Sequence, residues 1–185
     1  RLQLDSFKNS SSSINFIFAN DGSTDNTIEL LNKIKDDQRF FIFDSKVNLG
    51  KANIIQAAYS HYSNIFNYDT YNWIGYWDAD LATPLNEVKK MIQANNDRYK
   101  AIWGSRVYKL GSNIKRNKLR HYLGRIFATL ASAILDIKSY DSQCGAKLFN
   151  PELAKNALST RFQTHWIFDI EILLKINQDN VLEHP

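Results

Sequence analysis

The sequence of 185 residues predicts a single α/β domain, residues 1–185, built on a mostly parallel sheet flanked by helices. Short runs rich in β-branched and aromatic residues have the content of strands and lie at residues 14–19, 40–43, 73–77 and 101–104. Segments with helical spacing separate these runs, and such an alternation implies crossover connections between parallel strands. The composition, 44% hydrophobic and 23% charged, is ordinary for a globular domain of this length.

Each early strand is followed by a turn and the start of a helix. Residues 1–13 read as the last turn of a helix and a serine-rich link, and Asn20 to Asp25 follow the first strand as a turn with helix-capping residues. Residues 48–51 form the next turn, and Pro84 stands where a third helix begins. The helices that follow these turns have apolar faces containing Ile28, Leu31, Ile34, Ile54, Ile55, Ala58, Val88, Met91 and Ile92.

The second half is less regular. Residues 117–135 have apolar positions near helical spacing and a basic first turn, which fits either a core helix or a helix lying on a membrane surface. Residues 140–149 read as an extended segment turned at Gly145, and Pro151 begins a short helix that ends at Leu158. A last helix is predicted over residues 166–176, and no closing strand is predicted after it.

The charge is unevenly distributed although the net charge is only +4. No carboxylate lies between Asp97 and Asp136, whereas nine lysines and arginines do: Arg98, Lys100, Arg106, Lys109, Lys115, Arg116, Lys118, Arg120 and Arg125. This block attracts phosphate or an anionic membrane surface, or it is simply a solvated basic face. No nucleic-acid-binding motif accompanies it, so a nucleic-acid partner is not expected. The single Cys144 fits a reducing compartment.

The run from Trp73 to Trp77 ends in Asp78-Ala79-Asp80, and this is the feature around which the domain is organised. Ligands of open parallel sheets bind beyond the carboxyl ends of the strands. Two carboxylates at that place suit a divalent cation that also holds a phosphorylated substrate. Acidic pairs at this spacing are also common in surface loops, so the motif alone is weak.

Several motifs together resemble family 2 glycosyltransferases with the GT-A fold. They are Asn20-Asp21-Gly22-Ser23-Thr24-Asp25, Asn48-Leu49-Gly50-Lys51, Asp78-Ala79-Asp80 and Gly104-Ser105-Arg106, in that order. Two later segments, residues 141–149 and 166–171, look like the branch of dolichyl-phosphate glucosyltransferase and dolichyl-phosphate mannose synthase. Members of the family usually open with a strand that has no counterpart here, so the chain is expected to be a fragment of a longer protein.

The resemblance implies a nucleotide-sugar site and a metal site. It assigns the nucleotide sugar to Asp21, Gly22, Ser23, Lys51 and Asp78. It implies Mg²⁺ or Mn²⁺ on Asp80, with Asp78 holding either the ribose or a metal-bound water, so that the cation stabilises the leaving diphosphate. Asp21 is alternatively a turn or capping residue, and Lys51 is alternatively a surface charge.

The acceptor determines which other residues are needed. The resemblance places an acceptor phosphate on Arg106 and Arg125, whose planar guanidinium groups bind phosphate bidentately, while Asp141 and Gln143 either line the acceptor cleft or brace a strand. A sugar hydroxyl instead requires a general base, and Asp169 stands where many family members have one.

The main functional hypothesis is inverting transfer of a hexose from UDP-glucose or GDP-mannose to a polyprenyl phosphate. The alternatives are transfer to a sugar hydroxyl of a polysaccharide or glycan, and a non-catalytic module that binds nucleotide sugars. The expected location is the cytoplasm, at the face of a membrane, although no apolar run of roughly 20 residues is present to cross one.

Overall fold

The computed structural model describes residues 4–11, 13–105, 137–165 and 167–185. Its helices are α1 (Leu4–Lys8), α2 (Thr27–Asn32), α3 (Lys51–Ser63), α4 (Glu87–Asn95), α6 (Pro151–Leu158) and α7 (Phe168–Lys175), with short 3₁₀ helices η1 (Tyr68–Thr70) and η2 (Gln178–Asn180). Its strands are β1 (Phe16–Asp21), β2 (Phe40–Ser45), β3 (Ile74–Trp77), β4 (Ala101–Gly104), β5 (Ala146–Phe149) and β6 (Val181–His184). The predicted helix over residues 117–135 lies outside the described residues.

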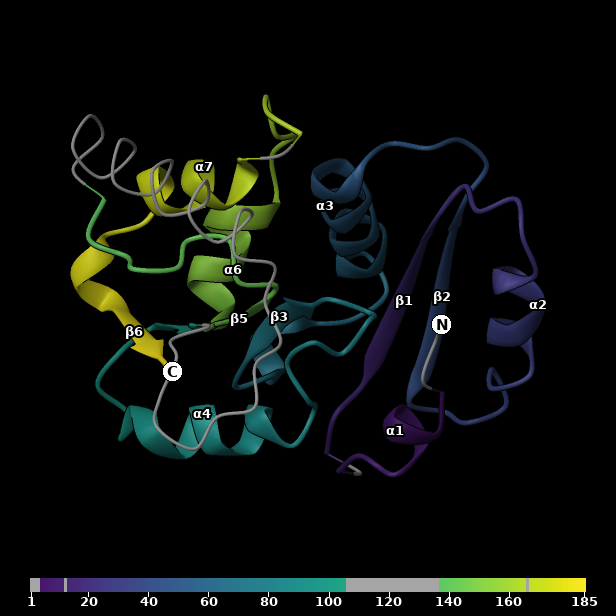
Figure 1. Ribbon diagram of the computed structural model, residues 1–185, viewed down its shortest axis with the longest axis horizontal. Coiled ribbons are helices and arrows are strands. Elements are labelled where there is room, and N and C mark those ends of the chain that lie inside the picture. Colours follow the sequence, from purple (N-terminus) through teal and green to yellow (C-terminus); the bar gives the residue numbers. More distant parts are fainter. Residues whose placement is uncertain (1–3, 12, 106–136, 166) are drawn as a thin grey trace, which may run out of the picture.

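The strands form two sheets. β1 and β2 pair in parallel, and a second sheet has the order β3-β5-β4-β6. In that second sheet β4 and β6 are parallel, whereas β5 runs antiparallel to both β3 and β4. Figure 1 shows the two sheets in the two halves of the molecule, with α3 between them. The predicted α/β fold is therefore confirmed; among the described strands, the β1–β2 and β4–β6 pairings are parallel as expected of a mostly parallel sheet, whereas both pairings made by β5 are antiparallel.

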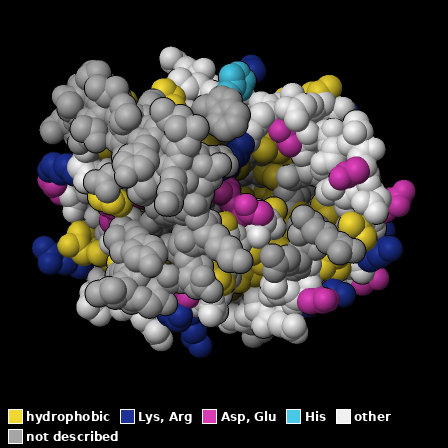
Figure 2. All heavy atoms as spheres, in the orientation of Figure 1, with side chains coloured by type: hydrophobic (Ala, Val, Ile, Leu, Met, Phe, Trp, Pro, Cys, Tyr) yellow, Lys and Arg dark blue, Asp and Glu magenta, His cyan; other side chains and the backbone are white. Residues whose placement is uncertain are grey.

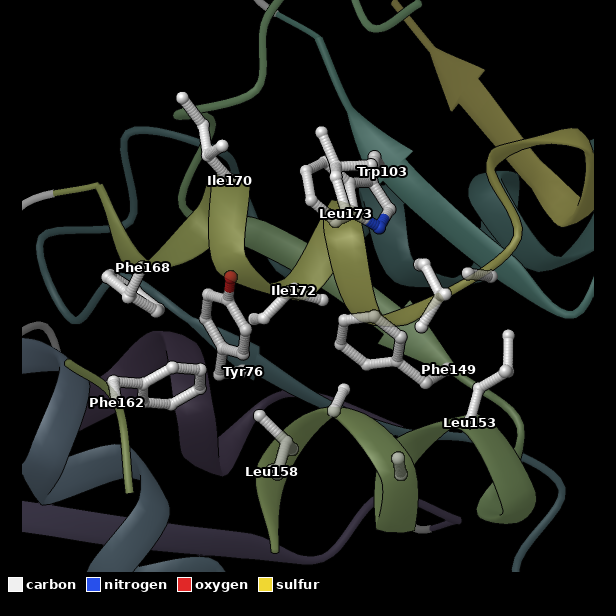
Figure 3. Packing of buried hydrophobic residues seen from close by; sticks show 14 of the residues in the cluster. Tyr76, Trp103, Phe149, Leu153, Leu158, Phe162, Phe168, Ile170, Ile172 and Leu173 are labelled. Carbon is white, nitrogen blue, oxygen red and sulfur yellow. The ribbon is translucent and has the colours of Figure 1, made fainter. Parts of the chain in front are cut away.

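Three clusters of buried side chains hold these layers together. The largest lies where α6 and α7 cover the second sheet and includes Tyr76, Trp103, Phe149 and Phe168 (Figure 3). A smaller cluster around Met91 packs α4 against the opposite face of the same sheet. The third is an aromatic cluster between α1, α2 and the first sheet, in which Phe7, Phe18 and Phe40 make edge-on contacts. Aromatic pairs in such geometries add to the stabilisation from burial.

Local sequence explains several boundaries. The Asn150 side chain accepts a hydrogen bond from the Leu153 amide and Pro151 occupies the first turn, so α6 begins at the predicted proline. The prediction that no strand follows the last helix is wrong, because Val181–His184 forms β6 and pairs with β4. This pairing joins segments far apart in the chain, and a four-residue strand gives little local signal of its partner.

Candidate functional site

The predicted nucleotide-sugar residues Asp21, Lys51 and Asp78 lie near the carboxyl ends of β1, β2 and β3. β1 ends at Asp21, and the in-register parallel pairing with β2 brings the turn after β2 beside it. Asp78 follows β3 directly. An ion pair between Lys51 Nζ and Asp78 Oδ1, at 2.5 Å, connects the start of α3 to the end of β3 and so joins the two halves of the molecule.

Asp21 fixes the turn that leads into α3. Its Oδ1 accepts a hydrogen bond from the Leu49 amide at 2.6 Å and its Oδ2 accepts one from the Gly50 amide at 2.9 Å. The next residue, Gly22, has φ of 67°, and a Cβ there would lie 2.8 Å from the Val47 carbonyl carbon. Only glycine fits such a close backbone approach without strain. Asp21 thus braces the Leu49–Gly50 turn, while its predicted contact with the nucleotide sugar stays a prediction.

Asp78 lies between the Lys51 ammonium and Gly145. The Lys51 and Asp78 side chains are 44% and 37% exposed, so their ion pair is open to solvent and contributes little stability. On the other side, the Asp78 amide donates to the Gly145 carbonyl at 2.8 Å. A Cβ at Gly145 would lie 2.5 Å from Asp78 Oδ1 and would overlap the rest of the carboxylate. The absence of a side chain at residue 145 is what allows Asp78 its position.

Asp80 lies in an exposed turn after β3. Its Oδ1 accepts a hydrogen bond from the Ala82 amide at 3.0 Å, and the Trp77 indole N–H, donating to the Thr83 carbonyl at 2.6 Å, closes the turn. Leu81 has φ of 52°, a left-handed conformation that is unfavourable for a branched apolar residue. Its side chain packs against the aromatic cluster around Phe7 and Phe18, which holds the turn in that conformation.

Figure 2 shows acidic side chains near the middle of one face of the molecule, beside hydrophobic side chains. No group of three or more histidine, cysteine, aspartate or glutamate side chains that could hold a metal occurs among the described residues. A Mg²⁺ or Mn²⁺ ion on Asp78 and Asp80 stays a prediction; such an ion would have to take its other ligands from water and from substrate phosphates, as Mg²⁺ commonly does. The two aspartates do not form a complete protein cage within the part of the chain that the structure describes.

A buried charged pair lies beneath Asp78. Lys147 in β5 stands opposite Tyr76 of β3 and Trp103 of β4, and cross-strand neighbours project to the same face of a sheet. Lys147 Nζ is 2.7 Å from Asp169 Oδ1 of α7, and the two side chains are 0% and 5% exposed. The Tyr76 hydroxyl also donates to Asp169 Oδ1; in Figure 3 this hydroxyl points from the sheet toward α7.

Burial is the main cause of the pKa shifts of Lys147 and Tyr76. Desolvation lowers the pKa of the Lys147 ammonium, and the Asp169 carboxylate opposes that fall. Desolvation also raises the pKa of the Tyr76 hydroxyl well above its usual value, and the nearby Asp169 carboxylate adds to the increase. Tyr76 is therefore a neutral hydrogen-bond donor at physiological pH.

The other predicted acceptor residues are differently placed. The Asp141 amide donates to Glu183 Oε1 of β6 at 2.7 Å, and Gln143 is exposed. The Asp141 main chain thus belongs to a segment that is held against β6, and both alternatives for its side chain, lining the acceptor cleft or bracing a strand, remain predictions. Arg106 and Arg125 lie outside the described residues, so their predicted contact with phosphate remains a prediction too.

Two residues of the site were not predicted. Lys147 lies inside a strand of otherwise apolar residues, Ala146–Phe149, and Tyr76 lies inside β3. A lysine in a strand buried on both faces must have a charged partner, so its position in the run was a usable signal. The identity of that partner could not be predicted, because Asp169 lies in a helix distant in sequence.

The fold and site define an α/β domain with an acidic pair just after the carboxyl end of strand β3. Solved structures have the same fold: that of Staphylococcus aureus TarS residues 1–349 in complex with UDP covers 97% of this chain and 52% of its own, with a TM-score of 0.57 at 11% sequence identity. A second TarS structure, in complex with UDP-GlcNAc, gives a TM-score of 0.56 at 13% identity, covering 97% of this chain and 50% of its own. The predicted GT-A architecture is thereby confirmed.

The chain belongs to glycosyl transferase family 2, whose sequence profile matches residues 3–158. It is similar to a dolichyl-phosphate beta-glucosyltransferase of Saccharomyces cerevisiae, with 30% identity over 85% of this chain and 51% of the relative. It is also similar to dolichyl-phosphate beta-glucosyltransferase ALG5A of Trichomonas vaginalis, with 32% identity over 85% of this chain and 48% of the relative. The chain thus spans about half the length of the curated relatives that it matches.

Proposed function

We propose that this domain transfers glucose from UDP-glucose to a polyprenyl phosphate of the dolichyl type, with inversion at the anomeric carbon. The names of the relatives at about 30% identity support the sugar and the acceptor. The observation that carries the proposal is the burial of Asp169, because it bears on whether the acceptor needs a general base.

In the transfer, an acceptor oxygen attacks the anomeric carbon while the bond to the nucleoside diphosphate breaks and its electrons leave with UDP. A hydroxyl acceptor must lose a proton in this step, whereas a phosphate oxygen is already an anion. Asp169 Oδ1 already accepts hydrogen bonds from Tyr76 and Lys147, and the side chain is 5% exposed. Glu171, the other carboxylate early in α7, accepts hydrogen bonds from the Gln163 and Thr164 amides. Both carboxylates already accept hydrogen bonds from protein donors, which favours an anionic acceptor that needs no general base.

The donor site uses the residues at the strand ends. Asp78 and Asp80 would hold the cation, which as a Lewis acid offsets the charge that develops on the departing diphosphate. Lys51 Nζ lies within 2.5 Å of Asp78 and is 44% exposed, so it can exchange this carboxylate for a donor phosphate oxygen. Asp21 holds the Leu49–Gly50 turn from which α3 and Lys51 begin.

The acceptor site and its membrane setting remain part of the proposal. Arg106 and Arg125 are proposed to hold the acceptor phosphate, and the basic block is proposed to favour an anionic membrane surface. Within the described residues, no helix combines the length and apolar character needed to span a bilayer.

Asp169→Asn in the full-length protein tests the proposal. Asparagine can still accept from Tyr76 and Lys147 but is not a proton acceptor for a substrate. Because the substitution leaves Lys147 buried without its counter-ion, the rates are referred to the folded fraction, measured by thermal unfolding. On that basis, with polyprenyl phosphate and UDP-glucose, we expect kcat/KM to stay within about tenfold of the parent and the acidic limb of its pH profile to be unchanged. A loss of about a thousandfold together with loss of that limb would instead favour a hydroxyl acceptor. GDP-mannose in place of UDP-glucose tests the choice of donor.

A further inference from the structure

Lys147 is a charged group entirely enclosed by protein. Its side chain is 0% exposed, and removal of an ammonium from water costs several kcal/mol unless partners replace the lost hydration. Asp169 supplies the opposite charge, and the ammonium lies 4.3 Å from the centre of the Trp103 ring and 5.4 Å from that of Tyr76. A methionine or leucine would fill this place at lower cost, so the charge itself calls for an explanation.

The ammonium also reaches the turn that precedes β5. Lys147 Nζ donates to the main-chain carbonyl of Cys144, three residues earlier. Lys147 therefore connects three elements: strand β5, which carries it; helix α7, through Asp169; and the turn at Cys144 and Gly145. Of these contacts, only the one to Asp169 is needed to neutralise the buried charge.

The same turn fixes Asp78. The carbonyl of Gly145 accepts the Asp78 amide at 2.8 Å, and the Asp78 carboxylate lies against the bare Cα of Gly145. A shift of the Cys144–Gly145 peptide would move both the main chain and the carboxylate of Asp78. Cys144 itself is 1% exposed, so the turn is packed as well as hydrogen-bonded.

We propose that Lys147 is a positioning residue for Asp78: by holding the Cys144 carbonyl from inside the core, it fixes the turn against which the donor-binding carboxylate rests. The consequence for the donor rests on the proposed function, since it is there that Asp78 takes part in binding the nucleotide sugar. The competing explanation is that Lys147 only neutralises Asp169 and contributes to stability alone.

Neutralising both charges separates the two explanations. Lys147→Met leaves Asp169 buried without its counter-ion and is expected to be strongly destabilised. Lys147→Met combined with Asp169→Asn removes both charges but keeps a side-chain oxygen at residue 169 that can accept the hydrogen bond of the Tyr76 hydroxyl. This double variant is expected to recover most of the lost stability. Lys175→Met is the matched control, because Lys175 lies in α7 like Asp169, but its ammonium donates a hydrogen bond to the Thr160 hydroxyl at the surface.

Cys144, the single cysteine of the chain, reports on the turn directly. In the double variant we expect a melting temperature within a few degrees of the parent, labelling of Cys144 by Ellman's reagent at least about tenfold faster, and UDP affinity in the presence of Mg²⁺ about tenfold weaker. The Lys175→Met control should match the parent in all three. Parental labelling rate and parental UDP affinity in a double variant of restored stability would overturn the proposal.

If neither Lys147 variant folds, hydrogen exchange of the parent decides. The Asp78 amide is bonded to Gly145, so we expect it to open together with the amides of β5; independent, faster opening of Asp78 would overturn the proposal. The outcomes also separate this proposal from the proposed function. A parent that does not bind UDP, but whose double variant labels faster at Cys144, contradicts only the proposed donor. If the parent binds UDP and the double variant has the parental rate of Cys144 labelling and the parental affinity for UDP, only the role of Lys147 is contradicted.

Discussion

Gly145→Ala is the substitution most directly aimed at the site. The added Cβ would lie 2.5 Å from Asp78 Oδ1 and closer still to the rest of the carboxylate. The carboxylate is the free end of a side chain and is 37% exposed, so it can rotate away toward solvent. The expected response is movement of Asp78 and preservation of the fold.

The size of the effect follows from these contacts. Ordinary van der Waals contact begins at 3.4 Å, so the carboxylate has to retreat by about 1–2 Å. The retreat breaks the solvent-exposed pair with Lys51, which costs about 0.2–1 kcal/mol of unfolding free energy. For a chain of this size, that corresponds to a fall in Tm of roughly 1–4 °C. A displacement of about 1 Å in a substrate-positioning group, however, can reduce kcat/KM by about a hundredfold.

The assay compares nucleotide-sugar turnover and thermal unfolding of the full-length protein carrying Gly145→Ala. Asp78→Ala with and without Gly145→Ala supplies the control, because once the carboxylate is gone the new methyl group has nothing to displace. We expect the two changes together to be no worse than Asp78→Ala alone. Full turnover by Gly145→Ala, or a penalty that persists undiminished in the Asp78→Ala background, would refute the reasoning.

Three further predictions concern neighbouring charges. Lys51→Met should leave Tm within about 2 °C, because the pair with Asp78 is solvent-exposed, but weaken UDP binding about tenfold, as measured by calorimetry with Lys46→Met as the surface control. Asp80→Ala should abolish metal-dependent turnover without unfolding the protein; undiminished turnover would remove Asp80 from the metal site. Burial raises the pKa of Glu171, but the hydrogen bonds from Thr164 and Gln163 together outweigh it and lower that pKa, so the stabilisation from Glu171 is present at neutral pH and disappears as the pH falls through the folded-state value. The difference in unfolding free energy between the parent and Glu171→Gln should therefore shrink in urea titrations at acid pH; a constant difference would contradict this assignment.

Local patterns in the sequence were sufficient for the elements that carry their own signals. The Asn150-Pro151 pair marks the start of α6, and the apolar run that ends at Trp77 marks β3. The convergence of Asp21, Lys51 and Asp78 was also predictable, because side chains that follow parallel strands meet at one edge of a sheet. Strand direction was not: β5 is antiparallel to its neighbours, and nothing within Ala146–Phe149 specifies the direction of its partners.

The interior of the site could not be derived from spacing. Asp169 was predicted as a general base because of its place in a motif; its burial, 5% exposed, and its ion pair with Lys147 were not predicted. Whether it also serves as a base stays a prediction for the Asp169→Asn experiment. Burial depends on which helix covers which face of the sheet, and that information is distributed over the packing of α6 and α7 rather than held in one segment.

Because Leu81 has a left-handed conformation, the conformation of the turn at Asp80 depends on a distant part of the molecule. A branched residue at φ of 52° holds that conformation at a cost of about 1–2 kcal/mol, and here its side chain is retained by the cluster around Phe7 and Phe18. Heating that loosens this cluster will release Leu81 and let the turn at Asp80 relax toward an ordinary conformation. Inactivation by heat should therefore begin in the N-terminal half of the chain, at temperatures where the sheet beneath Asp78 is still intact.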